Sequence, residues 1–283
     1  MTNLWMSLAL LPLLLTPALA CADGDKTEAE KMAAEHQHDA PKPTEAAMTP
    51  PAQEVAGEDV VYAQVGGQPV HGYLARPKSA KGPLPGLIVI HEWWGLNDNI
   101  RQMTKRLAGE GYTALAVDLY GGQTADKPDA AMQLMQKVMK DMGPGEQNVR
   151  AAYQYLETQQ KAPKIGVIGW CFGGGWSLNT ALLLPDKIDA AVIYYGHLET
   201  DKDKLRPLQM PVIGFFGGKD QSISPESVHA FEAAMKGLGK SVEVHIYDDA
   251  NHAFANASGG NYNPAAAKDA WERTTAFLAK HLK

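Results

Sequence analysis

A cysteine inside a glycine-rich turn is the residue of this sequence best suited to nucleophilic chemistry. Cys171 lies in the run Gly169-Trp170-Cys171-Phe172-Gly173, between an apolar segment at 164–168 and a helical segment at 176–184. A sharp turn from strand to helix presents a nucleophile above a sheet, and glycine neighbours permit such strained backbone. The N-terminus of the following helix also favours thiolate over thiol. The turn therefore predicts a cysteine nucleophile, and the alternative is a buried thiol without a chemical role.

An acid and a base follow the cysteine at the ends of two later predicted strands. Asp220 comes just after the apolar run at 211–217, and His252 comes just after the run at 241–247. The order nucleophile, acid, histidine is typical of a strand–turn–helix nucleophile. The imidazole would hold the thiolate and later protonate the leaving group, while the carboxylate would fix the imidazole tautomer. Asp220 could instead cap the helix that begins near Ser224, and His91 and His197 also follow strands.

The stretch His91-Glu92-Trp93-Trp94-Gly95 follows another apolar strand and predicts part of an oxyanion hole. In a fold of this kind the second donor of that hole comes from the loop after the third strand. We expect the backbone N–H groups of Trp93 and Phe172 to point at the developing oxyanion. From chemistry alone, Glu92 is either a solvated loop residue or a partner for the thiol.

Strands and helices alternate along most of the chain. The sequence predicts strands at 59–65, 70–76, 86–91, 113–120, 164–168, 190–196, 211–217 and 241–247, and helices at 97–109, 126–140, 146–159, 176–184, 224–238 and from 264. This alternation predicts an α/β fold with a mostly parallel central sheet and helices on both faces. The working residues of such a fold gather at the carboxyl ends of the strands, where Cys171, Asp220 and His252 all lie. No internal repeat or second domain is evident.

The first 20 residues indicate an exported protein. Residues 1–20 carry no charged side chain, contain a long apolar run and end in Ala18-Leu19-Ala20, which is typical of a secretory signal peptide. An uncleaved N-terminal anchor is the alternative. Cys21 follows the predicted cleavage site as in a bacterial lipoprotein, so we expect a periplasmic protein with a possible membrane tether through lipidated Cys21. Cys171 would then have no disulfide partner in the fold and would remain free.

The segment 21–57 predicts a disordered tether, with the folded domain at 58–283. It contains no Phe, Trp, Tyr, Leu or Ile, so it cannot offset its ordering entropy with a core of its own. His36 and His38 could hold a metal ion weakly, but solvated side chains are the more common outcome there. Residues 22–59 hold ten acidic and three basic side chains, so the rest of this chain of net charge −6 is close to neutral. A protein without a basic face is not expected to bind nucleic acid.

Several ordered motifs together resemble the dienelactone hydrolase (carboxymethylenebutenolidase) family of the α/β-hydrolase superfamily, over about residues 59–283. They are Glu92-Trp93-Trp94-Gly95-Leu96-Asn97, Asp118-Leu119-Tyr120, Gly169-Trp170-Cys171-Phe172-Gly173-Gly174, Tyr194-Tyr195-Gly196, Gly217-Gly218-Lys219-Asp220 and Asn251-His252-Ala253-Phe254. The resemblance implies an α/β-hydrolase fold and a Cys171, Asp220, His252 triad without metal or organic cofactor. It also implies that Glu92 pairs with the resting thiol and swings away when substrate binds.

The chain departs from this family at the residues that hold the substrate carboxylate. The resemblance implies two arginines for that purpose, but Asn256 stands at the first position and no arginine occurs between Arg106 and Arg150. We expect Trp94 and Asn256 to contact the substrate, but the sequence does not determine whether that substrate is anionic. The leading hypothesis is an exported cysteine-dependent hydrolase of small esters or lactones that works through an acyl-enzyme. The alternative is a non-catalytic ligand-binding protein on the same scaffold.

Overall fold

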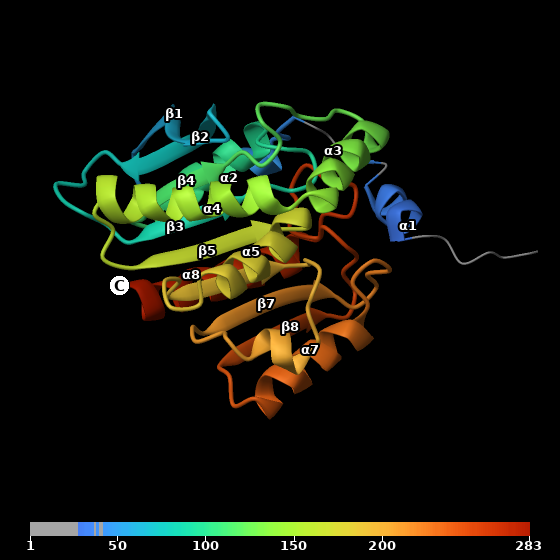
Figure 1. Cartoon of the computed structure of the whole chain (residues 1–283). Coiled ribbons are helices and arrows are strands. Elements are labelled where there is room, and N and C mark those ends of the chain that lie inside the picture. The colour runs from blue at the N-terminus through green and yellow to red at the C-terminus, as the bar shows by residue number, and fades with distance from the viewer. Residues whose placement is uncertain (1–27, 37, 40–41) are drawn as a thin grey trace, which may run out of the picture.

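The computed structural model describes residues 28–36, 38–39 and 42–283, and one eight-stranded sheet forms its centre (Figure 1). The strand order is β1-β2-β4-β3-β5-β6-β7-β8. The strands are β1 (Val55–Val65), β2 (Gln68–Pro77), β3 (Gly86–Ile90), β4 (Thr113–Val117), β5 (Ile165–Trp170), β6 (Ala190–Tyr194), β7 (Val212–Gly217) and β8 (Val242–Tyr247). The β1–β2 and β2–β4 pairs are antiparallel, and all pairs from β4 to β8 are parallel. The predicted α/β-hydrolase architecture is confirmed.

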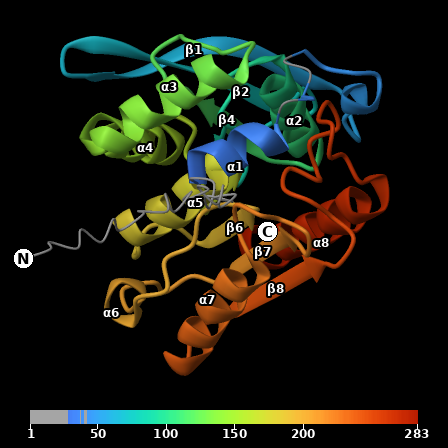
Figure 2. The ribbon, with the colours of Figure 1, turned by 90° about the vertical axis from the view of Figure 1, so that its right-hand side faces the viewer.

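Helices cover both faces of this sheet. They are α1 (Glu28–Glu35), α2 (Asp98–Gly109), α3 (Pro128–Lys140), α4 (Gly143–Gln154), α5 (Phe172–Leu183), α6 (Lys202–Leu205), α7 (Pro225–Gly237) and α8 (Pro264–Leu282), with a 3₁₀ turn η1 (Ala46–Met48) and a π-helical turn η2 (Tyr155–Gln159). Helices α2 and α8 lie on one face and α4 and α5 on the other (Figure 2). Every residue of β3 to β7 is buried, as continuous apolar strands between two helical layers require.

Side-chain caps explain where three of the helices begin. The side chain of Asn97 accepts from the Ile100 N–H at the start of α2. The side chain of Asn263 accepts from the Ala266 N–H at the start of α8. Ser224 caps α7, where a proline occupies the first turn. Because Ser224 is the cap, Asp220 is not needed to start α7 and stays available for another partner.

The N-terminal part departs from the predicted tether. Residues 28–35 form α1, η1 follows at 46–48, and β1 already begins at Val55 rather than at 59. Helix α1 lies beside the N-terminal end of α5 (Figure 2), at the edge where β5 ends. Composition could not show this, because α1 docks on a surface built by distant parts of the chain.

The predicted signal peptide and Cys21 lie outside the described residues. Among the helices that the structure describes, none combines the length and the apolar character needed to cross a membrane.

Candidate active site

Cys171 occupies a strained turn between β5 and α5. Its backbone angles are φ 53° and ψ −118°, a left-handed conformation that costs a non-glycine residue free energy. Its N–H donates to the Tyr194 carbonyl over 3.0 Å, which holds the turn. A Cβ atom at Gly169 would lie 2.0 Å from the Gly173 carbonyl oxygen, and one at Gly173 would lie 2.3 Å from that of Ile90. Only glycine lets helix and strands approach so closely, so the turn has the predicted elbow form.

Asp220 and His252 meet beside the cysteine. His252 Nδ1 donates to Asp220 Oδ2 over 2.8 Å, and both side chains are fully buried. Asp220 Oδ1 accepts from the N–H groups of Ser222 and Ile223, so the carboxylate is fixed in place. The other ring nitrogen of His252, Nε2, is buried and has no hydrogen-bond partner among the described residues. A ring nitrogen of His252 lies within 4.8 Å of Cys171 Sγ, so the structure brings the three predicted residues together.

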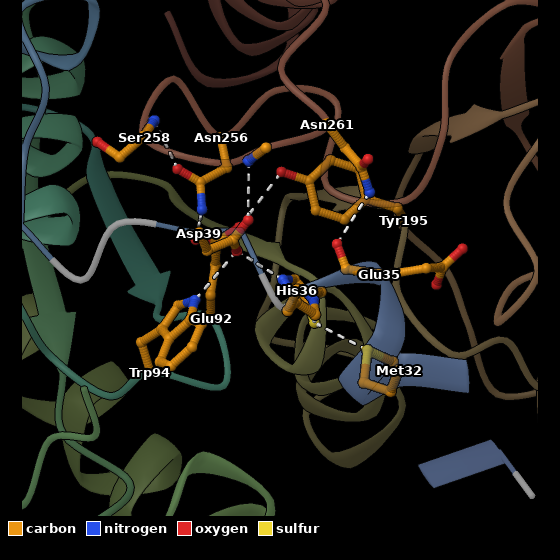
Figure 3. A network of polar contacts seen from close by, with 12 residues as sticks. Met32, Glu35, His36, Asp39, Glu92, Trp94, Tyr195, Asn256, Ser258 and Asn261 are labelled. Atoms are coloured by element: carbon orange, nitrogen blue, oxygen red, sulfur yellow. Dashed lines mark hydrogen bonds and ion pairs between the residues drawn. The ribbon is translucent and has the colours of Figure 1, made fainter. Parts of the chain in front are cut away.

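Glu92 does not make the contact that the resemblance implied. Its Oε2 accepts from Asn256 Nδ2 over 3.0 Å, and its Oε1 accepts from the Tyr195 hydroxyl over 3.4 Å (Figure 3). Burial, and after it the charges of Cys171 and Asp39, raise the pKa of Glu92 to about 8. The Glu92 carboxyl is therefore mostly protonated at neutral pH. Its hydrogen bonds go to Asn256 and Tyr195, which the sequence had not singled out as its partners.

The space beside the thiol is taken by the N-terminal segment. Met32 Sδ lies 3.8 Å from Cys171 Sγ, and His36 Nε2 lies 3.6 Å from it. The His36 ring also packs 4.5 Å from the Trp93 ring and 5.2 Å from the His252 ring, centroid to centroid. His36 is 0% exposed, so the expectation of a solvated side chain is wrong for this residue. The sequence marked His36 only as a weak candidate metal ligand, and it placed neither His36 nor Met32 beside Cys171.

Two carboxylates fix this segment in the site. Glu35 Oε1 accepts from the Gln221 N–H over 2.9 Å, and Glu35 Oε2 accepts from the Ser222 hydroxyl over 2.6 Å. The Glu35 carbonyl also accepts from Asn261 Nδ2 (Figure 3). These bonds attach the end of α1 to the loop that carries Asp220 and to the segment that precedes α8.

The second carboxylate, Asp39, orients His36. Asp39 Oδ2 accepts from His36 Nδ1 over 2.6 Å and from Trp94 Nε1 over 3.3 Å, while its Oδ1 accepts from the Gly260 N–H. Trp94, which the sequence predicts as a substrate contact, thus holds the segment in this state.

The surrounding charges favour a thiolate. Burial alone would raise the pKa of the Cys171 thiol, but the imidazoles of His252 and His36 lower it to about 6. Burial opposes the charge on both rings. Even so, Asp220 and Cys171 raise the pKa of His252 well above its usual value, and Asp39 and Cys171 raise that of His36 to about 9. At neutral pH the site holds a thiolate between two imidazolium rings, a form suited to nucleophilic attack.

The two predicted oxyanion donors lie where α5 and the β3 loop begin. Phe172 is the first residue of α5, and the first N–H groups of a helix have no partner within it. Trp93 follows β3 in the loop that also carries Glu92. Their part in an oxyanion hole stays a prediction.

A small cavity next to Glu92 includes a cation that the sequence analysis did not place there. Glu92, Tyr195 and Asn256 line it together with Arg106 of α2. The Arg106 guanidinium stacks over the Trp271 ring, 4.1 Å from its centroid. The residues around Arg106 form the ordinary amphipathic helix α2 between β3 and β4. They give no indication that Arg106 lines this cavity.

Known proteins match the chain over most of its length. A profile of the dienelactone hydrolase family matches residues 70–282. "Protein usf" of Aquifex pyrophilus is 36% identical, covering 76% of this chain and 95% of that protein. A protein of Aquifex aeolicus named "Putative carboxymethylenebutenolidase" is 32% identical over 77% of this chain and 96% of its own. The crystal structure titled "Putative Dienelactone Hydrolase" from Klebsiella pneumoniae has a TM-score of 0.73 at 28% identity, covering 81% of this chain and 100% of that one. The chain belongs to the dienelactone hydrolase family of the α/β-hydrolase superfamily, and it is a hydrolase that acts on esters or lactones.

Proposed function

We propose that the enzyme hydrolyses small esters or lactones through a thioester on Cys171. The observation that carries this proposal is the pairing of His252 with Asp220, which leaves an unpartnered imidazole nitrogen on the side of a buried thiol. One carboxylate therefore fixes the tautomer of the base, as cysteine and serine triads require.

The reaction runs in two steps. The Cys171 thiolate attacks the carbonyl carbon, and the oxyanion forms against the backbone N–H groups of Trp93 and Phe172. The His252 imidazolium then gives its proton to the departing alkoxide, which leaves a thioester. In the second step neutral His252 takes a proton from water, the hydroxide attacks the thioester carbon, and the thiolate leaves as the carboxylic acid is released.

Two polar groups beside the nucleophile favour an uncharged acyl group, and Arg106, the one cation among the described residues that line the adjoining cavity, is stacked on Trp271. Asn256 stands where the resemblance implied an arginine, and its amide donates to Glu92. Because the Glu92 pKa is raised to about 8, this carboxyl also offers a neutral surface at neutral pH. We infer a preference for neutral esters over esters that carry a carboxylate in the acyl part.

Substrate access requires the N-terminal segment to leave the site. Met32 and His36 lie against Sγ in the volume that an acyl carbonyl would need. The docked segment is thus a covered resting state, and turnover proceeds from the fraction of molecules in which it has moved away.

We also propose that the enzyme is exported by residues 1–20 and anchored by a lipid on Cys21. Mass spectrometry of the mature N-terminus tests this. A diacylated start at Cys21 is expected, whereas an unmodified start at Cys21 or Ala22 would remove the anchor.

Hydrolysis of a neutral aryl ester by the wild type, Cys171→Ala and Ser177→Ala tests the mechanism. Ser177 is the buried serine of α5, and its hydroxyl donates to the Val192 carbonyl. We expect a loss of about a thousandfold or more in Cys171→Ala, with the rate of Ser177→Ala close to that of the wild type. Equal rates in wild type and Cys171→Ala would refute a cysteine nucleophile.

A further inference from the structure

The thiol of Cys171 is surrounded by more donor atoms than a hydrolase triad needs. A triad uses one imidazole, here His252, but a second imidazole and a thioether also lie beside the sulfur. His36 Nε2 is 3.6 Å and Met32 Sδ is 3.8 Å from Sγ. A ring nitrogen of each histidine and Sγ all lie within 4.8 Å of one another. The proposed hydrolysis gives no chemical task to His36 or to Met32.

Two of the separations between these atoms fit a single metal ion placed among them. With metal–sulfur bonds of about 2.3 Å and metal–nitrogen bonds of about 2.0 Å, tetrahedral angles put a nitrogen and a sulfur ligand about 3.5 Å apart. The same geometry puts two sulfur ligands about 3.8 Å apart. The observed 3.6 Å between His36 Nε2 and Sγ, and 3.8 Å between Met32 Sδ and Sγ, match both values.

Both imidazoles are also oriented as metal ligands usually are. His36 Nδ1 bonds to Asp39 over 2.6 Å, and His252 Nδ1 bonds to Asp220 over 2.8 Å. A carboxylate on one ring nitrogen fixes the tautomer and leaves the other nitrogen free to bind the ion. His252 Nε2 is such a nitrogen, because it is buried and lacks a hydrogen-bond partner among the described residues.

We propose that Met32, His36, Cys171 and His252 form a four-coordinate site for copper(I). A thiolate and a thioether are soft ligands, and together with imidazole they select copper(I) over harder divalent ions. Copper(I) binds the Cys171 thiolate and one nitrogen of each imidazole, and each of the two imidazolium rings releases one proton to solvent, with no change of oxidation state. The side chains of Trp93 and Trp94, both almost fully buried, shield this position from water.

The site joins the N-terminal segment to the hydrolase domain. Two ligands come from residues 32 and 36 and two from the ends of β5 and β8, so a bound ion would lock the segment in its docked position. Bound copper would then prevent the Cys171 sulfur from forming a thioester with substrate and from reacting with an alkylating reagent. This consequence for turnover rests on the proposed function, but the metal site itself does not.

Anaerobic titration of the metal-free full-length chain with copper(I), held by a chromophoric chelator such as bicinchoninate, measures the affinity. We expect one copper per chain and an X-ray absorption spectrum that shows two nitrogen and two sulfur ligands. Met32→Leu and His36→Gln should each weaken binding by about tenfold to a hundredfold. Met48→Leu and His38→Gln, at exposed positions of the same part of the chain, are the matched controls and should bind as the wild type does.

Three results would overturn the site. They are the absence of a one-to-one copper complex, an affinity unchanged in Met32→Leu and His36→Gln, and tighter binding of zinc than of copper. Circular dichroism of each variant verifies that it is folded. Because the readout is metal binding and not turnover, copper binding by a protein whose metal-free form shows no esterase activity would refute the hydrolase mechanism and leave the metal site standing.

Discussion

His36 Nε2 lies 3.6 Å from Sγ of Cys171, although the two residues are 135 positions apart in the chain. His36 precedes the region that matches the family profile, which begins at residue 70. A segment outside the hydrolase domain proper therefore covers the nucleophile and changes its electrostatic surroundings. In this structure Met32, His36 and Asp39 determine the surroundings of Cys171 together with Asp220 and His252.

Loosening the segment should activate the enzyme. Glu35→Ala removes the bonds to Gln221 and Ser222, and hydrogen bonds to a charged group stabilise by about 1.5–3 kcal/mol. We expect kcat/KM for a neutral aryl ester to rise about tenfold, measured in steady-state assays. Glu45→Ala, at an exposed carboxylate near η1, is the control and should leave the rate unchanged. A Glu35→Ala rate equal to the wild-type rate would show that the segment does not limit access.

The thiolate should form at unusually low pH. The pKa of Cys171 is lowered to about 6, against about 8.5 for a free cysteine, so the thiolate fraction should rise through pH 6 as pH increases. Ultraviolet absorbance of the thiolate in metal-free protein, with Cys171→Ala subtracted, gives the titration. His36→Gln should move the midpoint upward because it removes one of the two cations. A wild-type midpoint above pH 8 would contradict the stabilisation of the Cys171 thiolate by the imidazolium rings of His36 and His252.

Asp220→Asn should impair the chemistry more than the fold. The amide cannot hold the imidazolium of His252 or fix its tautomer, so we expect kcat/KM to fall by about a hundredfold or more. Asp249→Asn, at an exposed carboxylate that pairs with Lys219, is the matched control. A loss of less than about threefold in Asp220→Asn would remove this carboxylate from the mechanism.

The elbow should not tolerate a larger residue than glycine. In Gly173→Ala the new Cβ would lie 2.3 Å from the Ile90 carbonyl oxygen, a backbone atom that cannot move aside cheaply. We expect the free energy of unfolding in urea to fall by about 3 kcal/mol. Gly82→Ala, where a Cβ meets no atom within 4 Å, should change it by less than about 0.5 kcal/mol. Equal stabilities of the two variants would contradict the packing described for the turn.

The sequence predicted the parts of this structure that depend on local pattern. The continuous apolar runs of β3 to β7 predicted a sheet covered on both faces, and the glycines around Cys171 predicted the elbow. Asp220 and His252 could be placed because each follows a parallel strand, so that all three residues come to one edge of the sheet.

The position of residues 28–39 could not be predicted in this way. Their composition shows that they lack a core of their own, but it does not show which surface they meet. Met32 is partly buried and His36 is fully buried, and both contact a surface that distant parts of the chain supply. The contacts of Glu92 with Asn256 and Tyr195 likewise join three separate loops. The sequence around each of these residues does not predict that they lie together.

We propose that Cys171 carries the acyl group during turnover. Mass spectrometry of metal-free protein, quenched in acid during the hydrolysis of an aryl acetate, tests this step. We expect an acetyl group on Cys171 in the wild type, accumulating further in His252→Gln, in which the base that activates water is missing. Continued hydrolysis with Cys171 unmodified in every sample would contradict it.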